Sequence, residues 1–249
     1  MPQIGTPPAI VEPTPARRAA RKVPSPRAVL PSVDLIHQRV LIAIVEHRLP
    51  PGTKLGEERL AKVFGVSRTQ IRQVLERLAH DSIVTVLHNR GAFVSSPTVE
   101  EAREVFAARR VIEADLIRQA TRMAQPADIL RLRGHVQKES AARAANDKRA
   151  IIRLSGEFHQ LIAEIAGNRF LAKTMRELET LTCLVIILYD APNVPACPYH
   201  EHSDIADVIE TRDVERAAAL MLEHLRHVEA SLNFERPGDG EIDFEAVFA

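Results

Sequence analysis

The sequence predicts a mostly α-helical protein, with an N-terminal winged helix-turn-helix domain followed by a C-terminal all-α bundle of six helices. Two observations indicate this fold class. Three helical patterns and a two-stranded hairpin follow one another within about 65 residues, which is the order of elements in a winged helix-turn-helix. Residues 98–235 then carry only helical patterns, with no alternation of strands and helices and no repeat at a fixed spacing.

The charge distribution supports a division into two domains. Residues 1–97 contain 14 Lys and Arg against 7 Asp and Glu, whereas residues 98–249 contain 19 against 26. This asymmetry indicates that the first domain faces a polyanion. No apolar run approaches the roughly 20 residues that span a bilayer, so we expect no membrane partner.

The composition of the chain also predicts its ends and its compartment. Eight of the 16 prolines lie in the first 31 residues among several arginines, a composition that cannot bury enough apolar surface to order itself. The N-terminus lacks the apolar core of a signal peptide, and Cys183 and Cys197 make no disulfide framework, so we expect a cytoplasmic protein. The predicted segments are a flexible basic tail (1–31), the winged domain (32–97), the helical domain (98–235) and a C-terminal tail (236–249).

The first two helices of the winged domain are separated by a break. A helical pattern runs from Asp34 to His47, and "LPPGTKLG" at residues 49–56 interrupts it with two prolines and a glycine. A shorter helix over residues 57–64 follows and ends at Gly65. The side chains expected to face inward are Leu35, Val40, Leu41 and Ile44 in the first helix and Leu60, Ala61 and Phe64 in the second.

The third helix has two distinct faces. Ser67 opens it, and Gln70 three residues later completes a capping box. Apolar side chains spaced at i, i+3, i+4 and i+7 predict the face that packs on the domain, and polar side chains occupy the opposite face. The apolar row is Ile71, Val74, Leu75 and Leu78, and the polar row is Arg68, Thr69, Arg72 and Gln73.

The polar row has the chemistry of DNA recognition. Side chains near the N-terminus of such a helix reach base edges when the helix lies in a major groove. Arginine contacts guanine, and glutamine contacts adenine, through paired hydrogen bonds. Periodicity alone leaves open that the row is simply a solvated face. Two β-type runs at residues 83–87 and 92–96, joined by "HNRG", then predict a hairpin that serves as the wing.

The helical domain begins with a second capping box, formed by Thr98 and Glu101. Gly167 and Asn168 stop one of its helices, and "APNVPACP" at residues 191–198 forms a loop. The predicted helices span residues 101–124, 126–145, 148–166, 169–190, 200–211 and 213–233.

Three histidines lie where a helical bundle normally places apolar side chains. His159, His202 and His224 each share a helix face with Ile, Ala, Leu or Met residues. Neutral imidazole is a ligand for Zn, Ni, Cu and Fe, so three inward histidines on three helices indicate a metal site. The alternative is that they are hydrogen-bonded core residues. Arg109 also points inward, where either a bound carboxylate or Glu113 one turn later would satisfy its guanidinium.

The segment "PPGTKLGEERLAKVFGVSRTQIRQVLERLAHDSIV", together with "NRGAFV", resembles the DNA-binding domain of the GntR family of bacterial transcription regulators. The resemblance implies that Arg68 and Arg72 contact DNA and that Gly91 of the wing approaches the minor groove. The family's usual Pro, Glu and Ala are replaced by Gln70, Gln73 and Val74, which affects the operator sequence rather than the fold. The residues expected to contact DNA are Arg59, Arg68, Thr69, Gln70, Arg72, Gln73, Arg90 and Gly91.

The segments "SGEFHQLIAEIAGN" and "EHSDIADVIETRDVERAAALMLEHL" resemble the FCD domain, the effector-binding domain of the FadR branch of GntR regulators. Six helices resemble its VanR-type subgroup. The resemblance implies that His159, His202 and His224 bind a divalent metal, zinc first, with nickel, iron and manganese as alternatives. Ser155 stands where the family has an Asp or Asn ligand, so water or the effector is expected to complete the site. Arg109 and Ser155 are the expected effector-binding residues, and His200, His227 and Cys197 are not expected to be ligands.

These observations predict a metabolite-responsive repressor rather than an enzyme, with no catalytic residues. Its expected partners are double-stranded DNA carrying a short inverted repeat, a second copy of the chain in a homodimer, and a small anionic effector, a carboxylate. The alternative is a metal-dependent hydrolase with a DNA-binding appendage, which the lack of a carboxylate in register as general base disfavours. A third interpretation makes the metal purely structural.

Overall fold

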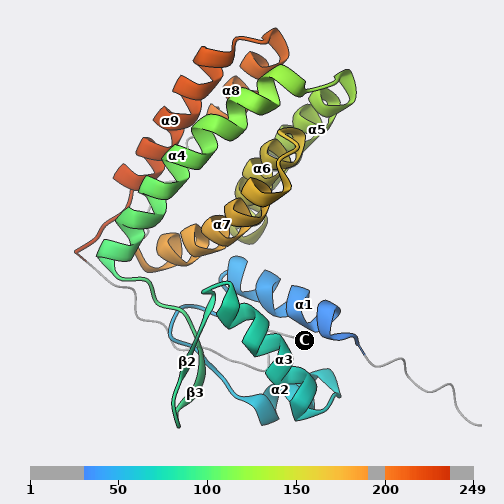
Figure 1. The fold of residues 1–249 in the computed structure, drawn as a ribbon, viewed down its shortest axis with the longest axis vertical. Helices are drawn as coiled ribbons and strands as arrows, with labels where there is room; N and C mark the ends of the chain where they lie inside the picture. The colour runs from blue at the N-terminus through green and yellow to red at the C-terminus, as the bar shows by residue number, and fades with distance from the viewer. Residues whose placement is uncertain (1–30, 190–199, 236–249) are drawn as a thin grey trace, which may run out of the picture.

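The computed structural model describes residues 31–189 and 200–235, which form a winged domain and a helical bundle (Figure 1). The mostly helical fold class is therefore confirmed. The expected N-terminal tail up to residue 30, the loop at 191–198 with Cys197, and the expected tail at 236–249 lie outside the described residues. Among the helices described, none combines the length and the apolar character that crossing a membrane requires.

The predicted elements of the winged domain are all present, with ends that shift by a residue or two. Gly65 ends the second helix in the left-handed region, at φ 66°, where glycine carries no steric penalty. The predicted capping box is confirmed, because the Gln70 N–H donates to Ser67 Oγ (3.3 Å) and the Ser67 N–H donates to Gln70 Oε1 (3.2 Å). The elements are α1 (Val33–Val45), α2 (Glu57–Phe64), α3 (Arg68–His80), β2 (Val84–Leu87) and β3 (Gly91–Val94).

A third strand, β1 (Lys54–Leu55), lies in the segment that the sequence analysis treated only as a break between helices. It pairs antiparallel with β3, so the strand order of the sheet is β1-β3-β2. Two backbone hydrogen bonds of 2.9 Å extend this pairing, from Gly52 to Val94 and from Val94 to Thr53. A strand of two residues is too short to show alternation in the sequence, and its partner follows only after two further helices.

The predicted inward face of α1 is wrong at one position. Leu35 is 46% exposed, whereas its neighbour Ile36 is fully buried. Leu35 and Ile36 are both apolar neighbours in the helix, so helical periodicity alone could not show which of them is buried. By contrast, the apolar row of α3 is confirmed. The buried side chains of the two helices are Ile36, Val40, Ala43 and Ile44 in α1 and Ile71, Val74, Leu75 and Leu78 in α3.

The helical domain is the predicted bundle of six helices. Its longest helix, α4, runs alongside α9 and also contacts α6, α7 and α8, so its inner face contributes to the centre of the core. The capping box at its start is confirmed by reciprocal hydrogen bonds between Thr98 and Glu101. The helices are α4 (Val99–Met123), α5 (Pro126–Ala144), α6 (Lys148–Ile165), α7 (Arg169–Tyr189), α8 (Glu201–Thr211) and α9 (Val214–Ala230).

The two domains share an apolar interface through α7. Leu184 of α7 is fully buried in the core of the winged domain, and Leu181 and Ile187 pack around it. An ion pair of 3.4 Å between Arg153 of α6 and Glu46 after α1 lies at the same interface. Figure 1 shows α1 lying against the end of the bundle from which α7 reaches the winged domain. A displacement of α7 would therefore shift Leu184 within the core of the winged domain.

Candidate functional site

The polar face of α3 is open to solvent, as DNA recognition requires. Arg68, Thr69, Arg72 and Gln73 are exposed, while the opposite face of the helix is buried. Gln70 is only half-exposed, and its Oε1 accepts the capping hydrogen bond from Ser67. Two arginines and a glutamine are thus exposed in the N-terminal half of a helix whose opposite face packs on the winged domain.

The wing carries further exposed residues that were predicted to contact DNA. Arg90 and Gly91 are both exposed, and Gly91 has φ 97°, a conformation that favours glycine at this end of the hairpin. The hairpin of β2 and β3 extends away from the helical bundle (Figure 1). The last predicted residue, Arg59, is exposed on α2.

Arg68 and Arg72, the two arginines predicted to contact DNA, have an acidic partner that the sequence analysis did not identify. Glu57, the first residue of α2, accepts hydrogen bonds from Arg72 Nε at its Oε1 (3.1 Å) and from Arg72 Nη2 at its Oε2 (2.9 Å). Arg68 Nη2 lies 3.4 Å from the same Oε2 atom. The hydrogen bonds from Arg72 hold the pKa of Glu57 below its ordinary value, so the carboxylate is charged at neutral pH.

The three predicted histidines meet inside the bundle. His159 of α6, His202 of α8 and His224 of α9 are each only 2–3% exposed. The Nε2 atoms of His159 and His224 lie 3.2 Å apart, and those of His202 and His224 lie 3.4 Å apart. One ligand atom from each residue falls within 4.8 Å of the others. Ligands placed tetrahedrally about 2.0–2.1 Å from a zinc ion are about 3.3–3.4 Å from one another, so these spacings fit a metal.

Each histidine has a glutamate on its other ring nitrogen. His159 Nδ1 donates to Glu113 Oε2 of α4 at 2.5 Å, and His202 Nδ1 donates to Glu139 Oε2 of α5 at 2.9 Å. His224 Nδ1 donates to Glu201 Oε2 of α8 at 2.7 Å. A charged carboxylate only accepts hydrogen bonds, so the proton of each neutral imidazole lies on Nδ1 and a lone pair lies on Nε2.

With the protons on Nδ1, the three Nε2 atoms converge as acceptors, and a cation placed between them would interact favourably with all three. Carboxylates that orient ligating histidines in this way are a general feature of protein metal sites. The residues present therefore fit a divalent metal held through nitrogen.

Electrostatics favour the protonation state that a metal needs at His159 and at the carboxylates of Glu113 and Glu139. Burial raises the pKa of Glu113, but Arg109 together with His159 outweighs this and brings the pKa to about 2. Burial likewise raises the pKa of Glu139, while hydrogen bonds from His135 and His202 bring it to about 2. Burial lowers the pKa of His159, which favours the neutral ring. Near neutral pH the carboxylates are charged and His159 is available as a neutral ligand.

Arg109 is paired with two glutamates inside the protein. Its Nε donates to Glu113 Oε1 at 2.6 Å, and its Nη2 lies 3.3 Å from Glu179 Oε2 of α7. The second contact is an ion pair without hydrogen-bond geometry, and both of its atoms are buried. A Cβ at Gly156 of α6 would lie 2.5 Å from Glu179 Oε1, so glycine at this position is what admits the Glu179 side chain. Of the two alternatives for Arg109, the structure shows the intramolecular pair.

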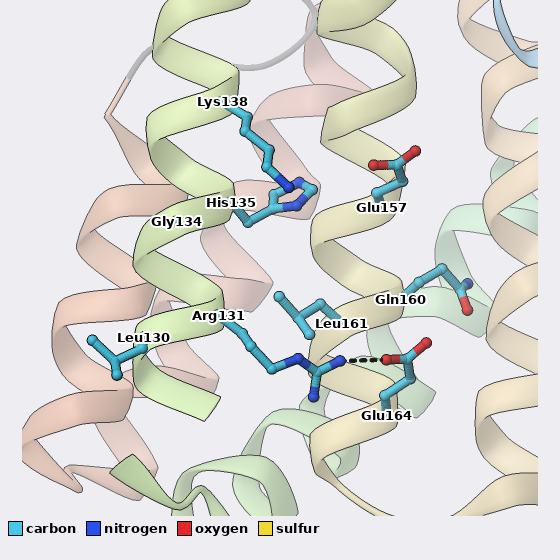
Figure 2. Close-up of a pocket in the computed structure, with 9 residues that line it drawn as sticks. All are labelled: Leu130, Arg131, Gly134, His135, Lys138, Glu157, Gln160, Leu161 and Glu164. Atoms are coloured by element: carbon cyan, nitrogen blue, oxygen red, sulfur yellow. Dashed lines mark hydrogen bonds and ion pairs between the residues drawn. The ribbon is translucent and has the colours of Figure 1, made fainter. Parts of the chain in front are cut away.

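The remaining predicted effector residue, Ser155, is half-buried on α6, one turn before His159. A surface groove of about 420 Å³ lies elsewhere, between α5 and α6 (Figure 2). An ion pair of 2.8 Å between Arg131 and Glu164 crosses it. Neither Arg109, Ser155 nor the three clustered histidines line this groove, so it does not coincide with the predicted effector site. Its lining residues are Leu130, Arg131, Gly134, His135, Lys138, Glu157, Gln160, Leu161 and Glu164.

Two family models match the chain, one for each domain. The model described as "Bacterial regulatory proteins, gntR family" matches residues 33–94, and the model described as "FCD domain" matches residues 104–227. These matched segments coincide with the winged domain and with most of the helical bundle.

Curated relatives of similar length are transcription regulators. The chain is 25% identical over 190 residues to the HTH-type transcriptional repressor RspR of Escherichia coli, with 76% of this chain and 83% of that protein covered. It is 26% identical over 247 residues to the HTH-type transcriptional repressor NanR of Salmonella newport, with 88% of this chain and 91% of that protein covered.

Solved structures share the arrangement of both domains. A GntR transcriptional regulator from Rhodococcus sp. RHA1 superposes with a TM-score of 0.69 at 25% identity, and the match covers 80% of this chain and 95% of that one. Escherichia coli McbR/YncC superposes with a TM-score of 0.71 at 17% identity and the same coverage, which supports the fold alone.

Proposed function

Because the chain belongs to the GntR family and joins its DNA-binding domain to an FCD domain, we propose that it is a metal-containing, metabolite-responsive repressor. The winged domain binds operator DNA through α3 and the wing, and the helical bundle binds the effector. Effector binding then lowers the affinity for DNA. The relatives RspR and NanR are both named repressors, which supports repression rather than activation of transcription.

The DNA contact is assigned to the exposed face of α3. Replacing Arg68 or Arg72 by alanine is expected to weaken specific DNA binding by about 1–3 kcal/mol each, because each arginine is able to contact a guanine with paired hydrogen bonds. Both side chains are more than half exposed, so the fold should be retained. A mobility-shift titration with a duplex selected from a random library by the wild-type protein measures the loss, and unchanged affinity in both variants would contradict the assignment.

The metal is assigned to His159, His202 and His224, with zinc as the first expectation and nickel, iron or manganese as alternatives. When bound, such an ion supplies a positive charge and an open coordination position for a carboxylate oxygen. Glu113, Glu139 and Glu201 orient the three imidazoles, and the histidines link α6, α8 and α9 around the ion. An effector bound to the ion would then act, through the three histidines, on the packing of α6, α8 and α9.

The missing carboxylate ligand can be restored. Replacing Ser155 by aspartate is expected to tighten Zn²⁺ binding on the order of 10-fold, because it adds a charged oxygen one helical turn before His159. Competition with a chelating dye measures the change. Ser203→Asp is the matched control, since Ser203 is also half-buried but directly follows His202 and so projects in a different direction. Equal tightening in both variants would indicate a general effect of charge and would remove Ser155 from the site.

The observation that carries the regulatory part of the proposal is the position of α7. Glu179 of α7 forms an ion pair with Arg109. Arg109 donates a hydrogen bond to Glu113, which also accepts a hydrogen bond from His159. Leu184, less than two turns further along the same helix, is buried in the core of the winged domain. A carboxylate effector that drew Arg109 away from Glu179 would alter the restraint on α7. The binding free energy of the effector would therefore differ between two placements of the winged domain, which is the condition for allosteric coupling.

A titration of Zn²⁺-loaded, full-length protein with mono-, di- and tricarboxylates tests this function. We expect at least one carboxylate to weaken binding to the selected duplex by about 5–150-fold without being consumed. Glu179→Gln should reduce that response while leaving DNA binding in the absence of the carboxylate intact. No response to any carboxylate would contradict an anionic effector acting through Arg109.

Two finer points belong to the same proposal. We propose that the chain belongs to the VanR-type subgroup, which the six helices of its bundle support, and that it forms a homodimer whose two α3 helices contact an inverted repeat. The hydrolase alternative has weaker support. The three carboxylates nearest the histidines are each hydrogen-bonded to an Nδ1 atom and are therefore engaged rather than placed as a general base.

A further inference from the structure

Glu57 is an acidic residue that contacts the two arginines which the proposed function presents to DNA. It lies at the first position of α2 and contacts Arg72 and Arg68 of α3, so it links the two helices of the DNA-binding motif through charge. The two arginine side chains are 62% and 58% exposed, whereas that of Glu57 is 28% exposed. The carboxylate of Glu57 is thus less accessible to an approaching DNA than the two arginine side chains that it contacts.

The geometry of the Arg72 pair leaves its recognition edge free. Glu57 accepts from Nε and Nη2, which is the side edge of the guanidinium. A guanidinium has five N–H donors, and this pairing uses only two of them. The end edge, with one hydrogen from each Nη, remains available for the O6 and N7 atoms of a guanine. A pair that merely masked Arg72 would have covered that end edge.

We propose that Glu57 is a specificity-determining residue that positions Arg72, and with it Arg68, for base recognition. The inference rests on the proposed role of these arginines in DNA binding. Glu57 fixes the rotamers of two flexible side chains before DNA arrives, so fewer degrees of freedom are lost on binding. Its negative charge also repels phosphates, and therefore an arginine held by Glu57 is less able to turn toward the backbone of any DNA sequence.

Glu57→Gln tests the proposal, because glutamine keeps the shape of the side chain and removes its charge. The probes are the duplex selected by the wild-type protein and a duplex with the same bases in shuffled order. Glu57→Gln is expected to lower the ratio of the two affinities by about 10-fold, the range of one good base contact. Single base-pair substitutions in the selected duplex should show the loss at the positions at which Arg72→Ala and Arg68→Ala also lose their preference.

Glu58→Gln is the matched control, because Glu58 is exposed in the first turn of the same helix and the substitution removes the same charge. Both variants should bind shuffled DNA more tightly than the wild type, but only Glu57→Gln should lose discrimination. Adding Glu57→Gln to a variant that already carries Arg68→Ala and Arg72→Ala should cause no further loss of discrimination.

Three results would overturn the proposal. If Glu57→Gln discriminates between the selected and the shuffled duplex as well as Glu58→Gln does, the ion pair between Glu57 and Arg72 has no role in specificity. If Glu57→Gln improves discrimination, Glu57 competes with the operator instead of positioning the arginines. If the wild-type protein selects no sequence from the library, the DNA-binding function itself fails, and this inference fails with it.

Discussion

Replacing His224 by alanine is expected to lower the affinity of the protein for Zn²⁺ by about 100-fold or more. Loss of residues that only support a ligand costs roughly 10–100-fold, and the loss of a ligand itself should cost no less. His224 is the central member of the cluster, since its Nε2 lies within 3.4 Å of the Nε2 atoms of both His159 and His202. Calorimetric titration of the metal-free protein with Zn²⁺ measures the effect.

His227→Ala is the matched control for this experiment. His227 lies three residues further along α9 and shares the carboxylate of Glu201 with His224, but it is about half exposed and stands outside the cluster of converging nitrogens. The His227 variant should bind Zn²⁺ about as well as the wild type. If both variants bind the ion equally, or if the wild type cannot be loaded with any divalent metal, the three histidines are hydrogen-bonded core residues.

Replacing Arg109 by alanine is expected to destabilise the fold by about 3–5 kcal/mol, the usual cost of removing one partner from a buried ion pair. Arg109 is 2% exposed, and its removal would leave Glu113 and Glu179 without their cation in the core. The free energy of unfolding of the metal-free protein, taken from urea denaturation, is the quantity to measure, because bound metal would add its own contribution.

The neighbouring residue gives the comparison. Arg110 also pairs with a glutamate, Glu229 of α9, but both side chains are partly exposed. Arg110→Ala should therefore cost less than about 1 kcal/mol, as solvent-accessible ion pairs generally do. Similar losses in the two variants would mean that Arg109 is not held in a buried network, and the coupling of the histidines to α7 through Glu113 and Glu179 would lose its basis.

Several features of the candidate site were predictable because they depend on residues close together in the chain. The two faces of α3 follow from helical spacing between Arg68 and Leu78, and its start follows from Ser67 and Gln70 three residues apart. The inward direction of His159, His202 and His224 was visible in the same way, from the apolar residues that share their helix faces. The roles of Ser155 and of the exposed residues on α3 and the wing stay predictions.

Other features could not be found in this way. The strand β1 has only two residues, and Leu35 and Ile36 were indistinguishable by periodicity. Glu57 reads in the sequence as a favourable acidic residue at a helix start, and nothing local indicates that it faces Arg72 fifteen residues later. For Arg109 the sequence left a bound carboxylate and Glu113 open as partners; the fold shows the pair with Glu113 and adds Glu179 of α7, which no local pattern indicated.

Local patterns in the chain were therefore enough to predict the two domains, the limits of most helices and the histidines that turn inward, since each of these depends on residues within a few helical turns. Which carboxylates hold those histidines depends instead on how the helices pack. Glu113, Glu139 and Glu201 lie 46, 63 and 23 residues from their partners. Such pairs depend on how packed helices are rotated and shifted against one another, and that rotation is set by the whole core, which no local pattern encodes.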